Sequence, residues 1–227
     1  MQTLVVALLV GTTFCTQGMA ETIISISGPS TAAIALTSNA AETASWTQIT
    51  SFQNVVISAM VSGPALGMAY LTTSIGPGTT LVDQIASTSF SFPSTPGFVL
   101  LFSGLALRPD TYFLTLTSNG RVSYEAGTWS CVEQCQGSAA SVVTDLGVSR
   151  NADRYTFGGG TNAIYPPAGN FILSSRDLIY TVATAPEPGV AGLLGTGLLT
   201  ATLLRQKRFG INIKTGLAEP ESSKFLR

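Results

Sequence analysis

The stretch Thr111-Tyr-Phe-Leu-Thr-Leu-Thr117 alternates with a period of two residues. Tyr112, Leu114 and Leu116 share one face, whereas Thr111, Phe113, Thr115 and Thr117 share the other, as in a β-strand. Arg108-Pro109-Asp110 before it predicts a turn. Ser118-Asn119-Gly120 after it predicts a hairpin that leads into a second strand over Arg121–Tyr124.

Segments of the same kind recur along the chain, separated by turns rich in Gly and Pro. They are Thr22–Ser27, Ala33–Thr37, Asn54–Val61, Gly67–Ile75, Thr80–Phe92 (with a possible break), Phe98–Leu107 and Phe171–Val182. Short strands with a turn about every ten residues are typical of sandwiches. The sequence therefore predicts an all-β, jelly-roll-like β-sandwich over residues 21–183.

The composition excludes several classes of function. The chain has 227 residues, no histidine, and 10% charged residues, against about 25% in an average soluble domain. Without histidine, Ser-His-Asp catalysis and histidine-bound metals are excluded. No basic residue precedes Arg108, which argues against nucleic acid as a partner. We expect no cofactor and no metal.

The N-terminus resembles a secretory signal peptide. An apolar run from Leu4 to Val10 is followed by Gln17-Gly18-Met19-Ala20, and small residues at the end of such a run are what a signal peptidase requires. The sequence predicts a signal peptide over residues 1–20, with cleavage after Ala20. No Lys or Arg precedes the run, so either the α-amino group alone supplies the positive charge or translation starts upstream of Met1.

The C-terminus combines a Pro-Glu-Pro motif, an uncharged run and a basic cluster. Pro186, Glu187 and Pro188 precede the 16 uncharged residues Gly189–Leu204, after which Arg205, Lys207 and Arg208 follow. As a helix, the run would span about 24 Å of the roughly 30 Å hydrocarbon layer. Snorkelling basic side chains can cover the difference, and they hold that end in the cytoplasm. We predict a transmembrane helix over residues 189–204.

Together, these three parts resemble the PEP-CTERM sorting signal of bacterial exported proteins, here over residues 184–208. The resemblance implies export, transient anchoring in the inner membrane, and cleavage at Pro186-Glu187-Pro188 by an exosortase-type enzyme. The product would reach the cell surface or the extracellular matrix. This chain departs from the family pattern in its polar tail, residues 209–227, which we expect to remain cytoplasmic.

Two cysteines lie in the predicted β domain, Cys131 and Cys135. In an oxidising compartment they are expected to form a disulfide. By the chain-entropy model, closing so short a loop stabilises the fold by about 2 kcal/mol. Free thiols and a metal or redox role are the alternatives.

Four carboxylates lie close together in the sequence: Glu125, Glu133, Asp145 and Asp153. Two that faced a sugar about 5–10 Å apart could serve glycoside hydrolysis. The segment Asn151-Ala-Asp153 offers oxygen ligands for Ca²⁺, but Arg150 and Arg154 flank it and oppose a cation.

Aromatic side chains could stack on a sugar, although most of them belong in a core. Trp129 and Tyr165 lie in turn-rich segments, so they are the residues we expect to be exposed for ligand stacking.

The leading hypothesis is an exported, non-enzymatic cell-surface or extracellular-matrix protein, with an exosortase, the membrane and extracellular polysaccharide as partners. The alternative is a secreted carbohydrate-binding module or glycoside hydrolase.

Overall fold

The computed structural model describes residues 20–122, 124–132, 135, 141–156, 164–174 and 176–186, with the side chain of Thr31 left out. Several predictions therefore fall outside the described residues. These are the signal peptide before Ala20, residues Glu133, Glu187 and Pro188, the span 189–204, the basic residues Arg205, Lys207 and Arg208, and the tail 209–227. Within the described part, no helix combines the length and apolarity needed to cross a bilayer.

The described chain is all-β, with fourteen strands and two short 3-10 turns. In chain order the elements are β1 (Thr22–Ser27), β2 (Ser30–Leu36), β3 (Glu42–Gln48), β4 (Phe52–Ser62), β5 (Leu66–Thr72), η1 (Leu81–Asp83), β6 (Gln84–Ser91), β7 (Gly97–Leu107), β8 (Asp110–Ser118), β9 (Gly127–Val132), β10 (Ser141–Thr144), β11 (Val148–Arg150), β12 (Arg154–Tyr155), η3 (Pro166–Ala168), β13 (Ile172–Leu173) and β14 (Tyr180–Thr184).

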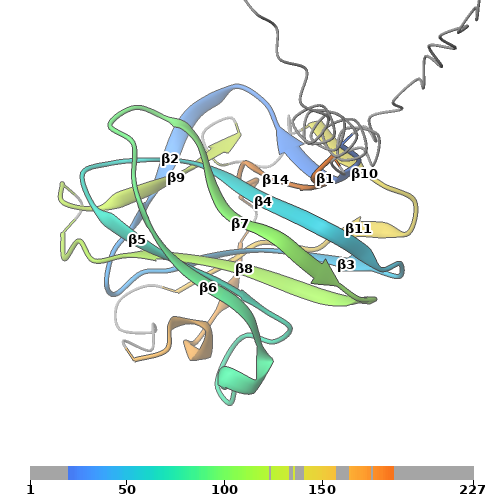
Figure 1. Cartoon of the computed structure of the whole chain (residues 1–227). Coiled ribbons are helices and arrows are strands. Elements are labelled where there is room, and N and C mark those ends of the chain that lie inside the picture. The colour runs from blue at the N-terminus through green and yellow to red at the C-terminus, as the bar shows by residue number, and fades with distance from the viewer. Residues whose placement is uncertain are drawn as a thin grey trace, which may run out of the picture. The chain divides into compact units, whose positions relative to one another are not determined.

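The strands form two antiparallel sheets that pack face to face (Figure 1). One sheet has the order β10-β1-β14-β4-β9-β2, with β7 on the other side of β4. The second has the order β13-β12-β3-β8-β5-β6, with β11 also paired to β3. The chain crosses between the sheets repeatedly, so each sheet joins strands from distant parts of the sequence.

The core lies between the sheets and follows the alternation seen in the sequence. Tyr112, Leu114 and Leu116 of β8 are buried, as predicted. Opposite them lie buried aliphatic residues of β1 and β4. The Trp46 ring contacts the Tyr112 ring at 5.6 Å and the Tyr180 ring at 6.1 Å between centroids. Offset aromatic contacts of this kind stabilise beyond the area they bury.

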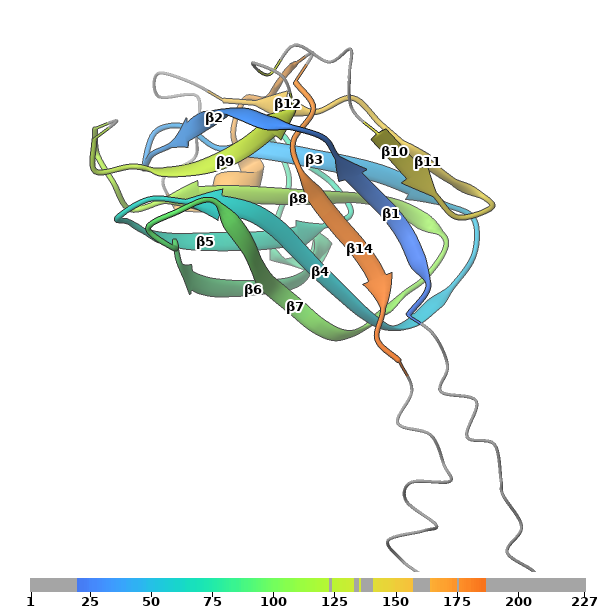
Figure 2. The same ribbon diagram turned by 90° about the horizontal axis from the view of Figure 1, so that it is seen from above.

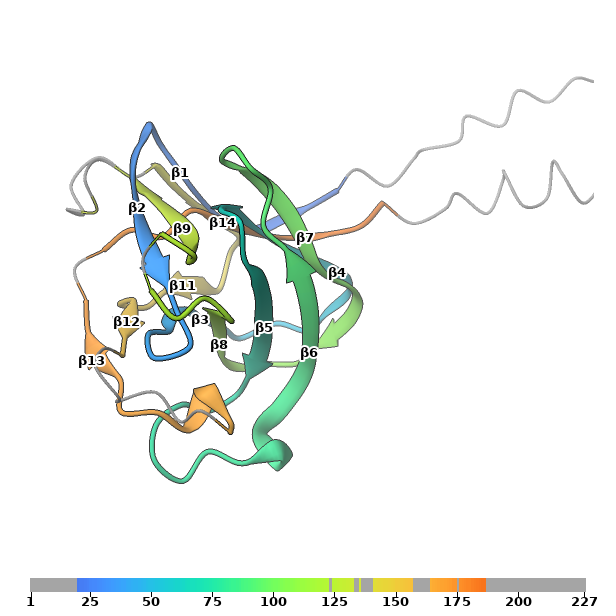
Figure 3. The same cartoon turned by 90° about the vertical axis from the view of Figure 1, so that its left-hand side faces the viewer.

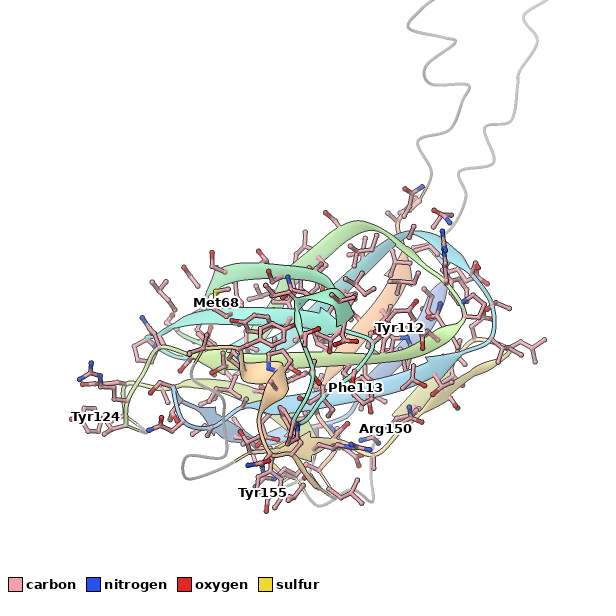
Figure 4. The ribbon with its side chains drawn as sticks, turned by 90° about the horizontal axis from the view of Figure 1, so that it is seen from below. Met68, Tyr112, Phe113, Tyr124, Arg150 and Tyr155 are labelled. Carbon is pink, nitrogen blue, oxygen red and sulfur yellow. A yellow bond between two sulfur atoms is a disulfide. The ribbon has the colours of Figure 1, made fainter. Side chains whose placement is uncertain are left out.

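The opposite face of β8 is also covered, which the alternation alone did not predict. Thr43 and Thr115 are buried, and their hydroxyls bond to each other at 2.8 Å. The Arg154 guanidinium lies over the Phe113 ring, 5.9 Å from its centroid. Figure 4 shows Phe113 and Tyr155 on this side of the molecule. These hydroxyls therefore satisfy each other within the fold instead of meeting water.

The hairpin predicted after β8 is wrong. Residues 121, 122 and 124 lie in no strand, and the next strand, β9, pairs with β2 and β4 of the other sheet. Both edges of β8 are already occupied by β3 and β5, so no edge is free for a hairpin partner. The Ser118 hydroxyl instead accepts hydrogen bonds from the backbone N–H groups of Gly120 and Gly127 and donates to the Leu36 carbonyl.

Two further boundaries differ from the prediction. The single strand expected over Phe171–Val182 is two strands, β13 and β14, which belong to different sheets. The break expected within Thr80–Phe92 is present, because η1 precedes β6. The 3-10 turn begins at a capping box in which Thr80 and Asp83 satisfy each other's backbone N–H groups. Strand β3, which has polar residues at alternate positions, was not among the predicted strands.

Candidate functional site

Two features of the described chain are candidates for a functional site. The first is a buried charge cluster, made of Glu42, Arg150, Asp153, Arg176 and Asp177. The second, which we call the end groove, lies beside Tyr124 and is lined by residues 63–66, 91, 92, 94, 119, 120, 124 and 125.

The charge cluster is built from segments far apart in the sequence. Arg150, at the end of β11, forms ion pairs with both Asp153 and Asp177. Its Nη2 lies 3.0 Å from Asp153 Oδ2 and also donates to the Arg176 carbonyl at 3.1 Å. Asp153 Oδ2 further accepts the Leu178 backbone N–H at 3.1 Å. Arg150 therefore fastens the segment before β14 onto the segment after β11.

A third ion pair extends the cluster to the start of β3. Arg176 pairs with Glu42, the first residue of β3, and its guanidinium lies over the Tyr155 ring, 4.6 Å from the centroid. Glu42, Asp153 and Asp177 are all buried. The two arginines thus supply the charge compensation that buried carboxylates require.

Burial changes the acidity of two of these carboxyls. Desolvation raises the pKa of Glu42 from 4.5 to about 8, and Arg176 opposes the shift only in part. Desolvation likewise raises the pKa of Asp153 to about 6, against the opposing effect of Arg150. Glu42 Oε2 and Asp153 Oδ1 have no hydrogen-bond partner among the described residues. A proton at either atom would relieve the cost of burying a charge.

The cluster borders a pocket of about 280 Å³, lined by residues 150–153, 174, 176 and 177. Asp153 and Asp177, the two carboxylates that line this pocket, are both paired with Arg150. At Asn151-Ala-Asp153, the segment considered for Ca²⁺, the Asp153 carboxylate forms an ion pair with Arg150, which competes with a cation there. The Asn151 side-chain amide donates to the Thr47 hydroxyl.

Of the four carboxylates suggested from the sequence, the three that the structure describes do not gather at one place. Glu125 lines the end groove, Asp145 lies in the turn between β10 and β11, and Asp153 lies in the charge cluster. The acids that do meet are Glu42, Asp153 and Asp177. These three acids are far apart in the sequence, so no local sequence pattern indicates that they meet. Their pairing with Arg150 and Arg176 depends on the tertiary fold.

The end groove consists of two adjoining pockets of about 440 and 470 Å³ that share Pro64, Ala65 and Leu66. The Tyr124 ring is 80% exposed beside it, and Figure 4 shows this ring at the periphery of the molecule. Asn119 is fixed against Leu66, since Leu66 N donates to Asn119 Oδ1 at 3.1 Å. An exposed aromatic ring beside an amide and the Glu125 carboxylate can stack on a sugar and bond its hydroxyls.

The loop that carries Tyr124 is held in place by close packing at a glycine. A Cβ at Gly120 would lie 2.4 Å from the Glu125 carbonyl oxygen, so no other residue fits there without a shift. The Ser38 backbone N–H also donates to the Gly120 carbonyl at 2.8 Å. Gly120 is therefore held closely between Glu125 and Ser38 in this wall of the groove.

Trp129 was expected to be exposed, and this expectation is wrong. Trp129 lies in β9, is fully buried, and donates its indole N–H to the Ile179 carbonyl at 3.0 Å. Tyr165 is half-buried, and its ring meets the Tyr70 ring edge-on at 5.8 Å. Trp129 cannot stack on a ligand, whereas Tyr124, an aromatic residue that the sequence did not favour over Trp129 and Tyr165, is 80% exposed.

Cys131 and Cys135 form a disulfide, as expected. Cys131 is buried in β9, and its backbone forms an isolated β-bridge with Leu178, two residues before β14. The bond therefore fixes the end of β9 where the chain leaves the sheet.

The comparisons with known proteins assign no family. No protein-family model matches the chain, and no curated protein matches it. One solved structure with a match is a chain of the T13 IBDV viral particle, at 12% identity and a TM-score of 0.29. The match covers 78% of this chain and 42% of that chain, so this chain spans less than half of its length. A similarity this low carries no argument about fold or function.

Proposed function

We propose that the protein is an exported, non-enzymatic cell-surface or extracellular-matrix protein, processed by an exosortase-type enzyme at its Pro-Glu-Pro motif. One observation carries the proposal: the described fold fits between the two predicted processing sites. Strand β1 begins two residues after Ala20, and β14 ends two residues before Pro186. Pro186 is exposed, so cleavage at either site would leave both terminal strands intact.

The jelly-roll assignment belongs to this proposal. Eight strands support it through the orders β2-β9-β4-β7 in one sheet and β3-β8-β5-β6 in the other. Two four-stranded sheets linked by crossovers of this kind are the pattern of double Greek-key sandwiches. Such a fold leaves β1, β10 and β14 as additions on one side of β4, where the two ends of the domain meet.

The charge cluster supports a structural role for the buried acids. Each of the three carboxylates is engaged by an arginine, and they join β3 to the segments on either side of β13. A binding or scaffolding protein needs such a fastening, whereas an acid catalyst needs a carboxyl that faces substrate.

The direct test is to replace Pro186-Glu187-Pro188 with three alanines in the native host. An uncleaved, membrane-retained form is expected, because the motif would no longer present the extended backbone that prolines enforce. The matched control replaces Ser94-Thr95-Pro96, an exposed turn of the β domain. Normal maturation of the motif variant would refute the sorting role.

A second candidate function, a carbohydrate-binding module, is favoured by the end groove. We infer that Tyr124 would stack on a sugar ring while Asn119 and Glu125 bond its hydroxyls. Glycan-array binding that Tyr124→Ala abolishes, and that the control Tyr155→Ala retains, would support it. Binding that both variants retain would exclude the groove.

A further inference from the structure

The first and last described strands meet at one end of the domain, which we call the exit end. The Thr184 backbone N–H donates to the Glu21 carbonyl at 2.8 Å, and the Ala185 N–H donates to the Asn54 carbonyl at 2.7 Å. Figures 2 and 3 show β1 beginning beside the point where β14 ends. An anchor attached to the residues after Ala185 would therefore keep the exit end, more than any other part of the domain, close to that anchor.

Two neighbouring loops at the exit end carry exposed aliphatic side chains. Ile49, which follows β3, is 71% exposed, and Leu146, between β10 and β11, is 90% exposed. The Ile49 N–H donates to the Gly147 carbonyl at 3.0 Å, so the two loops are adjacent. The Asp145 N–H donates to the Ile23 carbonyl at 2.9 Å, which places the second loop beside the start of β1.

The turn that carries Leu146 is fixed. Asp145 accepts the Leu146 N–H through its side chain at 2.7 Å and the Val148 N–H through its carbonyl at 3.1 Å. Gly147 has a φ of +81°, which favours glycine. Leu146 is therefore held outward by the backbone, and it cannot fold back onto the sheet without breaking these bonds.

The distance from the exit end to the predicted membrane segment is short. Ala185 to Pro188 are four residues, which reach at most about 14 Å when fully extended. The uncharged run Gly189–Leu204 begins directly after them. If that run spans the bilayer, the exit end stays within the same reach of the lipid headgroups.

We propose that Ile49 and Leu146, which we call the apolar tip, insert into the interfacial layer of the bilayer that holds the C-terminal span. This inference rests on the proposed function. Apolar side chains gain by leaving water for the interface, and the tether supplies a high effective concentration. Charged residues near these loops include Glu21, Asp110 and Asp145, with Arg108 the one base among them. Because this set has an acidic balance, the contact does not depend on attraction to anionic lipid, and a zwitterionic bilayer is the suitable probe.

The test uses the full chain in phosphatidylcholine vesicles, with an environment-sensitive fluorophore on a single engineered thiol. Cys15→Ser leaves that thiol alone reactive, because Cys131 and Cys135 are bonded to each other. Labels at Ile49→Cys and Leu146→Cys are expected to show blue-shifted emission and quenching by spin-labelled lipid. The matched control is Tyr124→Cys, which is equally exposed on the loop at the other end of β8 and should show neither effect.

The outcomes separate the inference from the function on which it rests. If the protein floats with the vesicles but the labels at positions 49 and 146 behave like the label at 124, the apolar tip does not insert and the inference is overturned. If the protein does not float with vesicles at all, the predicted membrane span fails, and the inference fails with it.

Discussion

At the scale of single residues, the buried carboxyls of the charge cluster determine how stability depends on pH. Glu42 is the clearest case, because burial and the Arg176 ion pair act on its carboxyl in opposite directions. With burial dominant, the folded protein binds a proton at Glu42 over the pH range in which the unfolded chain does not. The fold is therefore favoured at the acidic side of that range.

We predict that the free energy of unfolding falls as the pH rises from about 4.5 to about 8, the interval between the unfolded and folded pKa of Glu42. One titrating group limits the slope to about 1.4 kcal/mol per pH unit. Asp153 adds to the fall between its ordinary pKa of 3.8 and about 6. Urea unfolding at pH 5 and pH 8.5 measures the difference.

Glu42→Gln should flatten the part of this dependence above pH 6, because the amide stays neutral and keeps an acceptor for Arg176. Glu125→Gln, at an exposed carboxylate of the end groove, should leave the profile unchanged. A stability that rises with pH between 5 and 8 would mean that the Arg176 ion pair outweighs burial at Glu42.

Trp129 leads to a second prediction at this scale. Trp129→Phe keeps most of the apolar contact but removes the indole hydrogen bond to the buried Ile179 carbonyl, which still accepts the Met60 backbone N–H. The expected loss is about 0.5–1.5 kcal/mol of unfolding free energy for that hydrogen bond, measured by urea or thermal denaturation. Tyr124→Ala, at an exposed ring, should change it by less than about 0.5 kcal/mol. Equal stabilities of the two variants would show that the indole hydrogen bond does not contribute measurably to stability.

At the scale of elements, the alternation of apolar and polar residues predicted which face of a strand is buried. It did not predict features that depend on which other strands pair with that strand. The core face of β8 followed from Tyr112, Leu114 and Leu116 alone. Trp129 could not be placed in this way, since β9 is buried by β2 and β4, which lie far away in the sequence. The turn-forming residues before it favoured a hairpin, but β8 had no free edge to accept one.

The charge cluster was beyond prediction for a related reason. Glu42 and Arg176 are 134 residues apart, and no spacing rule joins them. Tyr124, by contrast, could have been found, because it lies between the Asn119-Gly120 turn and Glu125 in a segment with no sustained alternation.

Strand β7 yields a prediction about association. It pairs only with β4 among the described strands, and its residues from Gly97 to Leu107 include no charge and no proline. A long uncharged edge is a template for pairing with another chain. From Gly97 to Leu100 the register with β4 is regular, and Leu100 is 58% exposed. Leu100→Lys should therefore raise several-fold the protein concentration at which aggregation begins.

Light scattering across a concentration series measures this effect. The control Val82→Lys adds the same charge and removes an aliphatic side chain that is still more exposed, at 94% against 58%, but it lies in η1 and not in β7. If both variants shift the onset equally, net charge is responsible and the β7 edge is not.

At the scale of the whole described domain, β14, the last described strand, completes one of the two sheets. Strand β14 lies between β1 and β4, and its Tyr180 and Val182 are fully buried in the core. The sheet that holds both ends is thus incomplete until the chain has been delivered almost to Pro186. Pairings between such distant segments form slowly, because the entropy of closing the intervening loop must be overcome first.

We therefore predict opposite results for two truncations of the chain that starts at Glu21. A chain that ends at Pro186 should keep the thermal midpoint of the uncleaved protein, because every described strand remains. A chain that ends at Ile179 loses two core side chains, each contributing about 1.5–3 kcal/mol, together with the ladders to β1 and β4. Against a typical total stability of about 5–15 kcal/mol, it should not fold. Far-UV circular dichroism and resistance to trypsin distinguish the cases. If the shorter chain melted cooperatively at the same temperature, β14 would be dispensable, and cleavage near Pro186 would carry no constraint from the fold.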